Sequence, residues 1–181
     1  MVKSNSYKKI SFLISGGGSN LLEILKKNVI KKNFEVVTII SNRNISSKIK
    51  SYLNKFYKNV LIKENKKVLQ KKIFFNTDVI FSLGYMKVIE NEIIDNFDVI
   101  NLHPSILPLY KGLMTQKRML INNEKNFGFT IHKVSNQLDE GKTISNKIKK
   151  IGTKDEKELL FEHKTLEHEF VYKQFINYLL S

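Results

Sequence analysis

The stretch Ile10-Ser-Phe-Leu-Ile-Ser-Gly-Gly-Gly-Ser-Asn-Leu-Leu22 joins a short run of strand-forming residues to a glycine-rich turn and the start of a helical pattern. Residues 10–14 are continuously apolar or small, which predicts a buried strand. The residues that follow repeat leucine and valine at helical spacing through Leu25 and Val29, which predicts a helix over 20–32. This strand–turn–helix unit is the opening of an α/β fold.

The same alternation continues through the first hundred or so residues. We predict further strands over 36–40, 60–62, 78–82 and 98–101, and further helices over 45–56 and 66–75. Continuous Val, Ile and Leu runs are typical of parallel strands that are covered on both faces. The pattern therefore predicts an α/β fold, a doubly wound, mostly parallel sheet.

The second half has a different character. Both prolines of the chain lie in the stretch 103–108, which we expect to be an ordered loop. After it we predict a helix over 112–122, strands over 129–134 and 143–151, and a long C-terminal helix over 154–180. Thr153 and Glu156 form a capping-box signature at the start of that helix. With no repeat or linker along it, the chain is predicted to be a single domain over 1–181.

The charge is strongly positive, with 31 Lys+Arg against 17 Asp+Glu and a net charge of +14. Such a balance can indicate a nucleic-acid or membrane partner. Only Arg43 and Arg118 are arginines, however, and arginine is the residue that makes two-point contacts to guanine or phosphate. The composition therefore favours solvated lysines with no specific nucleic-acid partner.

The composition also excludes several classes of site. The chain has no cysteine, so disulfides, thiolate metal sites and cysteine nucleophiles are excluded. No apolar run reaches the roughly 18 residues that a membrane-spanning helix needs. The polar start of the chain, residues 1–9, lacks the apolar core of a signal peptide. We therefore expect a cytoplasmic protein without a membrane partner.

The glycine turn is a candidate anion site. Ser15-Gly-Gly-Gly-Ser-Asn20 lets backbone amides approach an anion, and the following helix adds the positive end of its dipole. It is neither a P-loop, because Gly-Lys-Ser/Thr is absent, nor a dinucleotide fingerprint, because position 21 is Leu21. Two interpretations stay open: a phosphate site, or a tight turn with an ordinary helix cap.

Two further motifs carry polar groups suited to catalysis. Asn101 and His103 lie two residues apart at the end of a predicted strand, so their side chains point the same way. An amide beside an imidazole suits the polarisation of a carbonyl and the handling of a proton. Asp139, in Leu138-Asp-Glu-Gly141, could orient the imidazole or relay a proton. The alternative is a solvated acidic turn.

Taken together, these motifs resemble the folate-dependent formyltransferase family, and within it the enzymes that formylate glycinamide ribonucleotide. The resemblance extends from Ile10 to about Tyr178. It rests on Ile14-Ser-Gly-Gly-Gly-Ser-Asn-Leu21, Ile40-Ser-Asn-Arg43, Gly84-Tyr-Met-Lys87, Ile100-Asn-Leu-His-Pro-Ser-Ile-Leu-Pro108, Gly128-Phe-Thr-Ile-His132, Leu138-Asp-Glu-Gly141 and Glu167-His168. It implies the formyltransferase fold, with a phosphate-binding half over about 1–100 and a folate-binding, catalytic half over about 101–181.

The resemblance also implies a reaction: formyl transfer from 10-formyltetrahydrofolate, a co-substrate, to the primary amine of glycinamide ribonucleotide in de novo purine synthesis, without a metal. Asn101 and protonated His103 would bind the developing oxyanion, while Asp139 holds His103 and passes on the proton of the amine. The expected phosphate- and ribose-binding residues are Gly17, Gly18, Ser19, Asn20 and Glu167. The expected folate-binding residues are Met86, Lys87, Val88, Ile89 and Ser135.

The chain departs from the family at several positions, among them the absence of a proline after Tyr172. Lys87 stands where relatives commonly have arginine, and Met114 and Gln116 stand where they often have histidine. Alternative functions stay open: formyl transfer to another amine, such as an amino sugar nucleotide or initiator methionyl-tRNA, formyl-group hydrolysis, or basic nucleic-acid binding on the same scaffold. The glycine loop favours a phosphoribosyl acceptor, whereas a tRNA acceptor would need a further domain. We expect two small-molecule substrates and a monomer or homodimer.

Overall fold

A computed structural model of the chain describes residues 7–15, 17–64, 68–152 and 155–181. The chain forms two compact units, Met1–Asp98 and Val99–Ser181. None of the described helices has the length and the apolar character that crossing a membrane requires. The expectation that 1–181 is a single domain stays a prediction.

The first unit is built on parallel strands in the order β3-β2-β1-β4. The strands are β1 (Lys9–Ile14), β2 (Glu35–Ser41), β3 (Leu61–Glu64) and β4 (Val79–Leu83). The helical elements between and after them are α1 (Ser19–Lys31), α2 (Ser47–Phe56), the short 3-10 helix η1 (Lys71–Phe74) and α3 (Asn91–Asn96). The strand–helix alternation read from the sequence is confirmed here.

The central strands of this unit are apolar because both of their faces are buried. Every residue of β4 is buried, as is β1 from Ile10 onward, so these strands are covered on both faces. The Phe12 ring lies 6.2 Å from that of Phe34 and 6.3 Å from that of Phe81. The aromatic contacts tie β1 to β4 and to the segment before β2.

Two predicted helices differ from those observed. In place of a helix over 66–75, the described residues form only η1, because Gln70 is extended and the N–H of Leu69 donates to the Glu90 carboxylate (3.0 Å) instead of continuing a helix. Residues 65–67 lie outside the described part of the chain. The helix predicted over 112–122 begins only at Thr115, since Gly112 and Met114 adopt positive φ angles of 78° and 57°.

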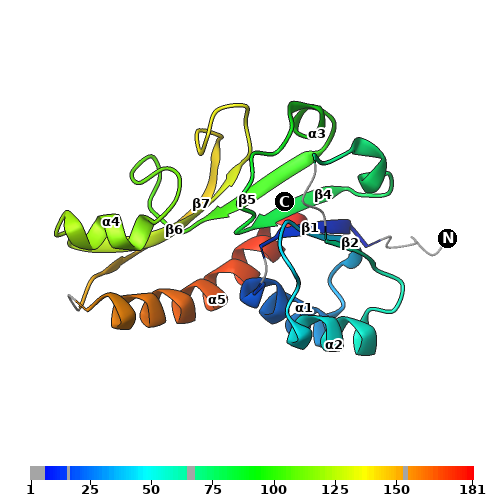
Figure 1. The fold of residues 1–181 in the computed structure, drawn as a ribbon, viewed down its shortest axis with the longest axis horizontal. Coiled ribbons are helices and arrows are strands. Elements are labelled where there is room, and N and C mark those ends of the chain that lie inside the picture. The colour runs from blue at the N-terminus through cyan, green and yellow to red at the C-terminus, as the bar shows by residue number, and fades with distance from the viewer. Residues whose placement is uncertain (1–6, 16, 65–67, 153–154) are drawn as a thin grey trace. The chain divides into compact units, whose positions relative to one another are not determined.

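The second unit combines antiparallel strands with a long helix. Its strands are β5 (Asp98–His103), β6 (Asn126–Lys133) and β7 (Thr143–Lys150), and β6 pairs antiparallel with both neighbours. Its helices are α4 (Thr115–Ile121) and α5 (Glu156–Leu180), and α5 runs along β6 (Figure 1). The observed cap of α5 is Asp155, whose carboxylate accepts the N–H of Glu158 (2.8 Å). Thr153, half of the predicted capping box, lies outside the described residues.

An aromatic cluster and one glycine hold β6 in place. Phe129 of β6 packs against Phe170 of α5 with ring centroids 5.7 Å apart. A Cβ at Gly128 would lie 2.1 Å from the carbonyl oxygen of Lys147 and 2.8 Å from Cγ1 of Ile106. No side chain fits at that distance, so position 128 requires glycine.

We predict that Gly128→Ala destabilises the fold, because the added methyl group must push β7 or the 103–108 loop aside. Overpacking of this kind typically costs about 1–3 kcal/mol. Urea unfolding followed by circular dichroism measures the change. Gly152→Ala is the matched control, since a Cβ there meets no atom of the described residues within 4 Å. An unchanged unfolding midpoint for Gly128→Ala would contradict the packing described.

Candidate active site

Strand β5 places two of the predicted catalytic side chains on one face. Asn101 and His103 are alternate residues of β5, so the pleat points them the same way. Antiparallel pairing sets Asn101 opposite His132 and His103 opposite Thr130 on β6. The face of β5 that carries the predicted site is thus completed by β6.

His103 is buried, and each of its ring nitrogens faces an acceptor. Nε2 lies 2.9 Å from the Tyr110 carbonyl oxygen, and Nδ1 lies 3.4 Å from Oδ2 of Asp139. Burial lowers the pKa of the imidazole from its ordinary 6.5, while the Tyr110 carbonyl and the Asp139 charge raise it; the net shift is downward. The ring therefore has the acceptors that a protonated imidazole needs, inside a site that resists the charge.

Asp139 is held by the backbone of a neighbouring loop. It adopts a positive φ of 54°, and its Oδ2 accepts the N–H of Gly112 (2.8 Å). Burial raises the pKa of this carboxyl, but the Gly112 N–H and the neighbouring His103 lower it, and the net shift is downward. A Cβ at Gly141 would lie 1.7 Å from the Lys133 carbonyl oxygen, so glycine lets this loop return close to β6.

His132 orients the Asn101 amide. Nδ1 of His132 lies 2.7 Å from the Lys133 carbonyl oxygen and therefore carries the proton. Nε2 is then an acceptor, and the Asn101 amide nitrogen donates to it at 3.2 Å. Because an amide nitrogen has two hydrogens, one is left for a substrate oxygen. Oδ1 of Asp139 lies 3.6 Å from the same Nε2, which is too long for a hydrogen bond.

The candidate phosphate loop lies in the first unit. Gly18 is the N-cap of α1 with φ 53°, and no side chain caps the helix; Ser19 and Asn20 are its first two residues. Within the described residues, Oδ1 of Asn20 is buried without a hydrogen-bond partner, and the same holds for Oγ of Ser15 and Oδ1 of Asn42. The start of α1 therefore lacks a side-chain cap. Gly17 is exposed, and Gly16 lies outside the described residues.

The remaining predicted residues divide between the two units. Met86, Lys87 and Val88 are exposed after the end of β4, whereas Ile89 is buried. In the second unit, the Ser135 hydroxyl donates to the carbonyl of Gln137 (3.0 Å). Glu167, on α5, is 6% exposed, and its Oε2 accepts from Lys164 (3.0 Å). Of all the predicted residues, the structure brings Asn101, His103 and Asp139 together around His132.

Sequence reasoning missed two partners of this cluster. The Tyr110 carbonyl is a main-chain group, so the residue type gives no signal of its contact with His103. His163, buried on α5, lies 3.3 Å through Nε2 from the Pro104 carbonyl oxygen. Its helical spacing from Glu167, four residues on, is the one signal in the sequence that could have found it.

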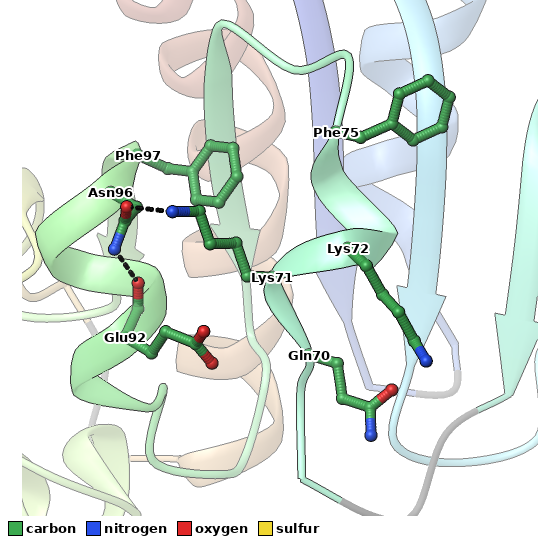
Figure 2. A pocket seen from close by; sticks show the side chains of 7 residues that line it. All are labelled: Gln70, Lys71, Lys72, Phe75, Glu92, Asn96 and Phe97. Carbon is green, nitrogen blue, oxygen red and sulfur yellow. Dashed lines mark hydrogen bonds between the residues drawn. The ribbon is translucent and has the colours of Figure 1, made fainter.

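An open groove of about 710 Å³ also lies in the first unit (Figure 2). Its lining residues come from η1, α3 and the segments beside them: Gln70, Lys71, Lys72, Phe75, Glu92, Asn96 and Phe97. The Asn96 side chain connects η1 with α3: it accepts a hydrogen bond from the Lys71 ammonium and donates one to the Glu92 carbonyl. None of the predicted site residues lines this groove.

No group of three or more His, Asp or Glu side chains in the described part of the chain is placed to hold a metal ion. The groups that the site does offer are an amide, two imidazoles and a carboxylate, all from the second unit. Such groups can stabilise charge on an oxygen and move a proton.

Comparison with known proteins identifies the family. Residues 8–175 match the family described as Formyl transferase. The chain belongs to the formyl transferase family. Over 156 residues it is 30% identical to phosphoribosylglycinamide formyltransferase of Escherichia coli (strain K12), a match that covers 75% of this chain and 69% of that protein. The predicted resemblance is confirmed.

Solved structures of the family confirm the predicted fold. The crystal structure of phosphoribosylglycinamide formyltransferase from Campylobacter jejuni subsp. jejuni NCTC 11168 is 30% identical, with a TM-score of 0.81, over 94% of this chain and 96% of that chain. Other relatives that the chain matches are much longer. The chain spans 12% of the trifunctional purine biosynthetic protein adenosine-3 of Chironomus tentans, to which it is 29% identical over 175 residues.

We predict that Asp139→Asn lowers the pKa of His103. The Asp139 charge raises that pKa, so its removal moves the titration midpoint of the ring to lower pH. NMR titration of the histidine Cε1–H signals measures the shift. Glu140→Gln is the matched control: Glu140 is the next residue, and its carboxylate pairs with Lys111 instead. An unchanged His103 midpoint in Asp139→Asn would contradict the assignment.

We predict that the fold loses stability as the pH falls through about 6.5. Burial lowers the pKa of His103 and of His163 below their ordinary 6.5, so the unfolded chain binds more protons than the folded one in this range. The contribution of these two histidines to the free energy of unfolding is therefore fully present above pH 6.5 and decreases below it. Thermal unfolding between pH 8 and pH 5 tests this, and His163→Leu should flatten the dependence. A melting temperature that rises on acidification would contradict it.

Proposed function

We propose that this chain transfers a formyl group from 10-formyltetrahydrofolate to the primary amine of glycinamide ribonucleotide in de novo purine synthesis. The observation that carries the proposal is the cluster of the Asn101 amide, the His103 imidazole and the Asp139 carboxylate. The names of the matched E. coli and C. jejuni proteins support this acceptor.

Asn101 would stabilise the charge that develops on the formyl oxygen when the acceptor amine adds to the formyl carbon. 10-Formyltetrahydrofolate supplies that formyl group when bound. The second hydrogen of the Asn101 amide is the donor, since His132 takes the first. Loss of one such donor typically costs about 10²–10³ in rate.

His103 would donate a second hydrogen bond to the same oxygen. Its Nε2–H is directed at the Tyr110 carbonyl, so the formyl oxygen must replace that carbonyl as the acceptor. Negative charge on the oxygen then offsets the burial that disfavours the protonated ring. Asp139, on the other side of the ring, lies 3.4 Å from Nδ1 and stabilises the positive charge of the protonated ring.

Asp139 would also receive the proton that the attacking amine releases. Because its pKa is lowered, the carboxylate is ionised at neutral pH and able to accept a proton directly or through water. Passed on to the departing folate nitrogen, that proton completes the transfer. No covalent bond to the enzyme is required.

The turn before α1 would bind the ribonucleotide phosphate through Gly17, Gly18, Ser19 and Asn20. Support comes from the free first turn of α1, whose N–H groups no side chain caps, and from the unpartnered buried oxygen of Asn20 among the described residues. Glu167, buried on α5, would contact the ribose hydroxyls.

The residues that would bind the folate are Met86, Lys87, Val88 and Ile89, in the segment that follows β4, and Ser135. Exposed apolar side chains at the carboxyl end of a parallel strand support this assignment. Lys87 keeps a positive charge for the glutamate tail of the folate but lacks the two-point geometry of arginine. We further infer a cytoplasmic monomer or homodimer whose partners are these two small molecules.

Turnover assays test the function and the roles together. With 10-formyltetrahydrofolate, we expect folate product with glycinamide ribonucleotide as acceptor. His103→Ala and Asp139→Asn should each lower kcat by about 10²–10⁴, the usual contribution of a placed acid or base. Glu140→Gln should retain wild-type kcat, since its side chain points to Lys111.

Two outcomes would reject parts of this proposal. Turnover with an amino sugar nucleotide but none with glycinamide ribonucleotide would reject the acceptor while keeping the chemistry. Wild-type kcat in either His103→Ala or Asp139→Asn would reject the assigned role of that residue.

A further inference from the structure

His163 is a buried polar ring inside an aromatic cluster. It lies on α5 with 2% of its surface exposed. The edge of its ring meets Phe129 at a centroid distance of 4.3 Å, and Phe127 lies at 5.4 Å. A buried imidazole has to find hydrogen-bond partners in such surroundings, and those partners determine its protonation.

The partners of His163 specify one neutral form. Thr115 donates to Oε1 of Gln116 (2.9 Å), so the amide nitrogen of Gln116 faces the imidazole, 3.4 Å from both Nδ1 and Nε2. The Pro104 carbonyl oxygen, 3.3 Å from Nε2, can only accept, so Nε2 carries the proton and directs it at that oxygen. Burial also lowers the pKa of His163, which favours the same neutral ring.

Pro104 is the first residue of the site that lies beyond the β5–β6 hydrogen-bond ladder. Strand β5 ends at His103, so the ladder to β6 no longer holds the chain from Pro104 onward. Proline has no N–H, which leaves its carbonyl as its only backbone hydrogen-bonding group. The next residue, Ser105, is fixed by its own contacts, since Thr130 donates to its carbonyl (2.7 Å).

His163 also shares a helix face with the predicted ribose ligand. Glu167 follows it by four residues on α5, and both side chains are buried. The Glu167 charge raises the pKa of His163 and the Lys164 charge lowers it, and neither reverses the effect of burial. The helix thus brings one residue to the catalytic loop and another to the proposed substrate.

We propose that His163 is a positioning residue for the catalytic loop: through the chain Thr115–Gln116–His163–Pro104 it fixes the backbone that follows His103, and so the direction of the His103 ring. This rests on the proposed formyl transfer for its kinetic readout. In this arrangement α4 and α5 jointly hold the loop. Gln116 is the residue of α4 whose side chain reaches His163 on α5.

Kinetics of His163→Leu test the proposal. Leucine fills the apolar site but donates nothing to Pro104, so we expect kcat to fall by about 10- to 100-fold, the effect of a small misplacement of a catalytic group. The KM for 10-formyltetrahydrofolate should stay unchanged. His163→Gln, whose amide nitrogen reaches the position of Nε2, should recover most of the lost kcat.

Phe175→Leu is the control for lost stability. Phe175 is fully buried on the same helix, so the variant should lower the melting temperature while kcat stays at the wild-type value. If His163→Leu retains wild-type kcat, or if His163→Gln is as impaired as His163→Leu, the positioning role is wrong.

A double-mutant cycle tests the chain of contacts. Gln116→Leu should lower kcat, as His163→Leu does. The kcat of the double variant should equal that of the more impaired single variant, because both substitutions interrupt the same chain of contacts. Multiplying effects in the double variant would overturn the connection through Gln116.

NMR of the histidine rings separates this proposal from the proposed function. In His163→Leu the ring signals and titration midpoint of His103 should shift, whereas in Phe175→Leu they should match the wild type. If the wild-type protein does not formylate glycinamide ribonucleotide, the function fails, and this comparison still decides the role of His163. Unshifted His103 signals in His163→Leu would overturn it.

Discussion

The antiparallel pairing of β5 with β6 is the interaction on which the candidate site depends. It sets Asn101 opposite His132 and His103 opposite Thr130. The first pair orients the amide, and Thr130 holds the loop that leaves β5 by donating to Ser105. A slip of one residue in this register would turn both β5 side chains to the other face of the strand. Gly128, in β6, permits the close approach of β7 and of Ile106 in the loop that follows β5.

Opposing electrostatic effects act on the imidazole of His103. Burial disfavours a charged His103, while the Tyr110 carbonyl and the Asp139 carboxylate, one at each ring nitrogen, favour it. The pKa of the Asp139 carboxyl is lowered although the group is partly buried, because its Oδ2 accepts the N–H of Gly112 and His103 lies beside it. A ring whose charge is resisted by burial and favoured by fixed acceptors responds strongly to a new charge beside it. That is the behaviour expected of a group that acts only when substrate charge develops.

The sequence predicted the fold better where neighbouring residues decide the structure. Continuous apolar runs gave β1, β2 and β4, because strands buried on both faces leave no alternation to misread. The helix expected over 66–75 failed because the N–H of Leu69 found the Glu90 carboxylate, a partner about twenty residues away. The start of α4 was misplaced for a local reason: Met114, an ordinary helix former, is held at positive φ.

The sequence by itself determined that Asn101 and His103 share a face, since the strand period places alternate residues together whatever they pack against. It also determined the glycine turn before α1 and the family to which the chain belongs. Only the tertiary structure decided what surrounds the imidazole of His103. Asp139, Tyr110 and, through Pro104, His163 reach that ring from separate segments of the second unit. Contacts between distant segments depend on how loops and helices pack, and no local pattern encodes that packing.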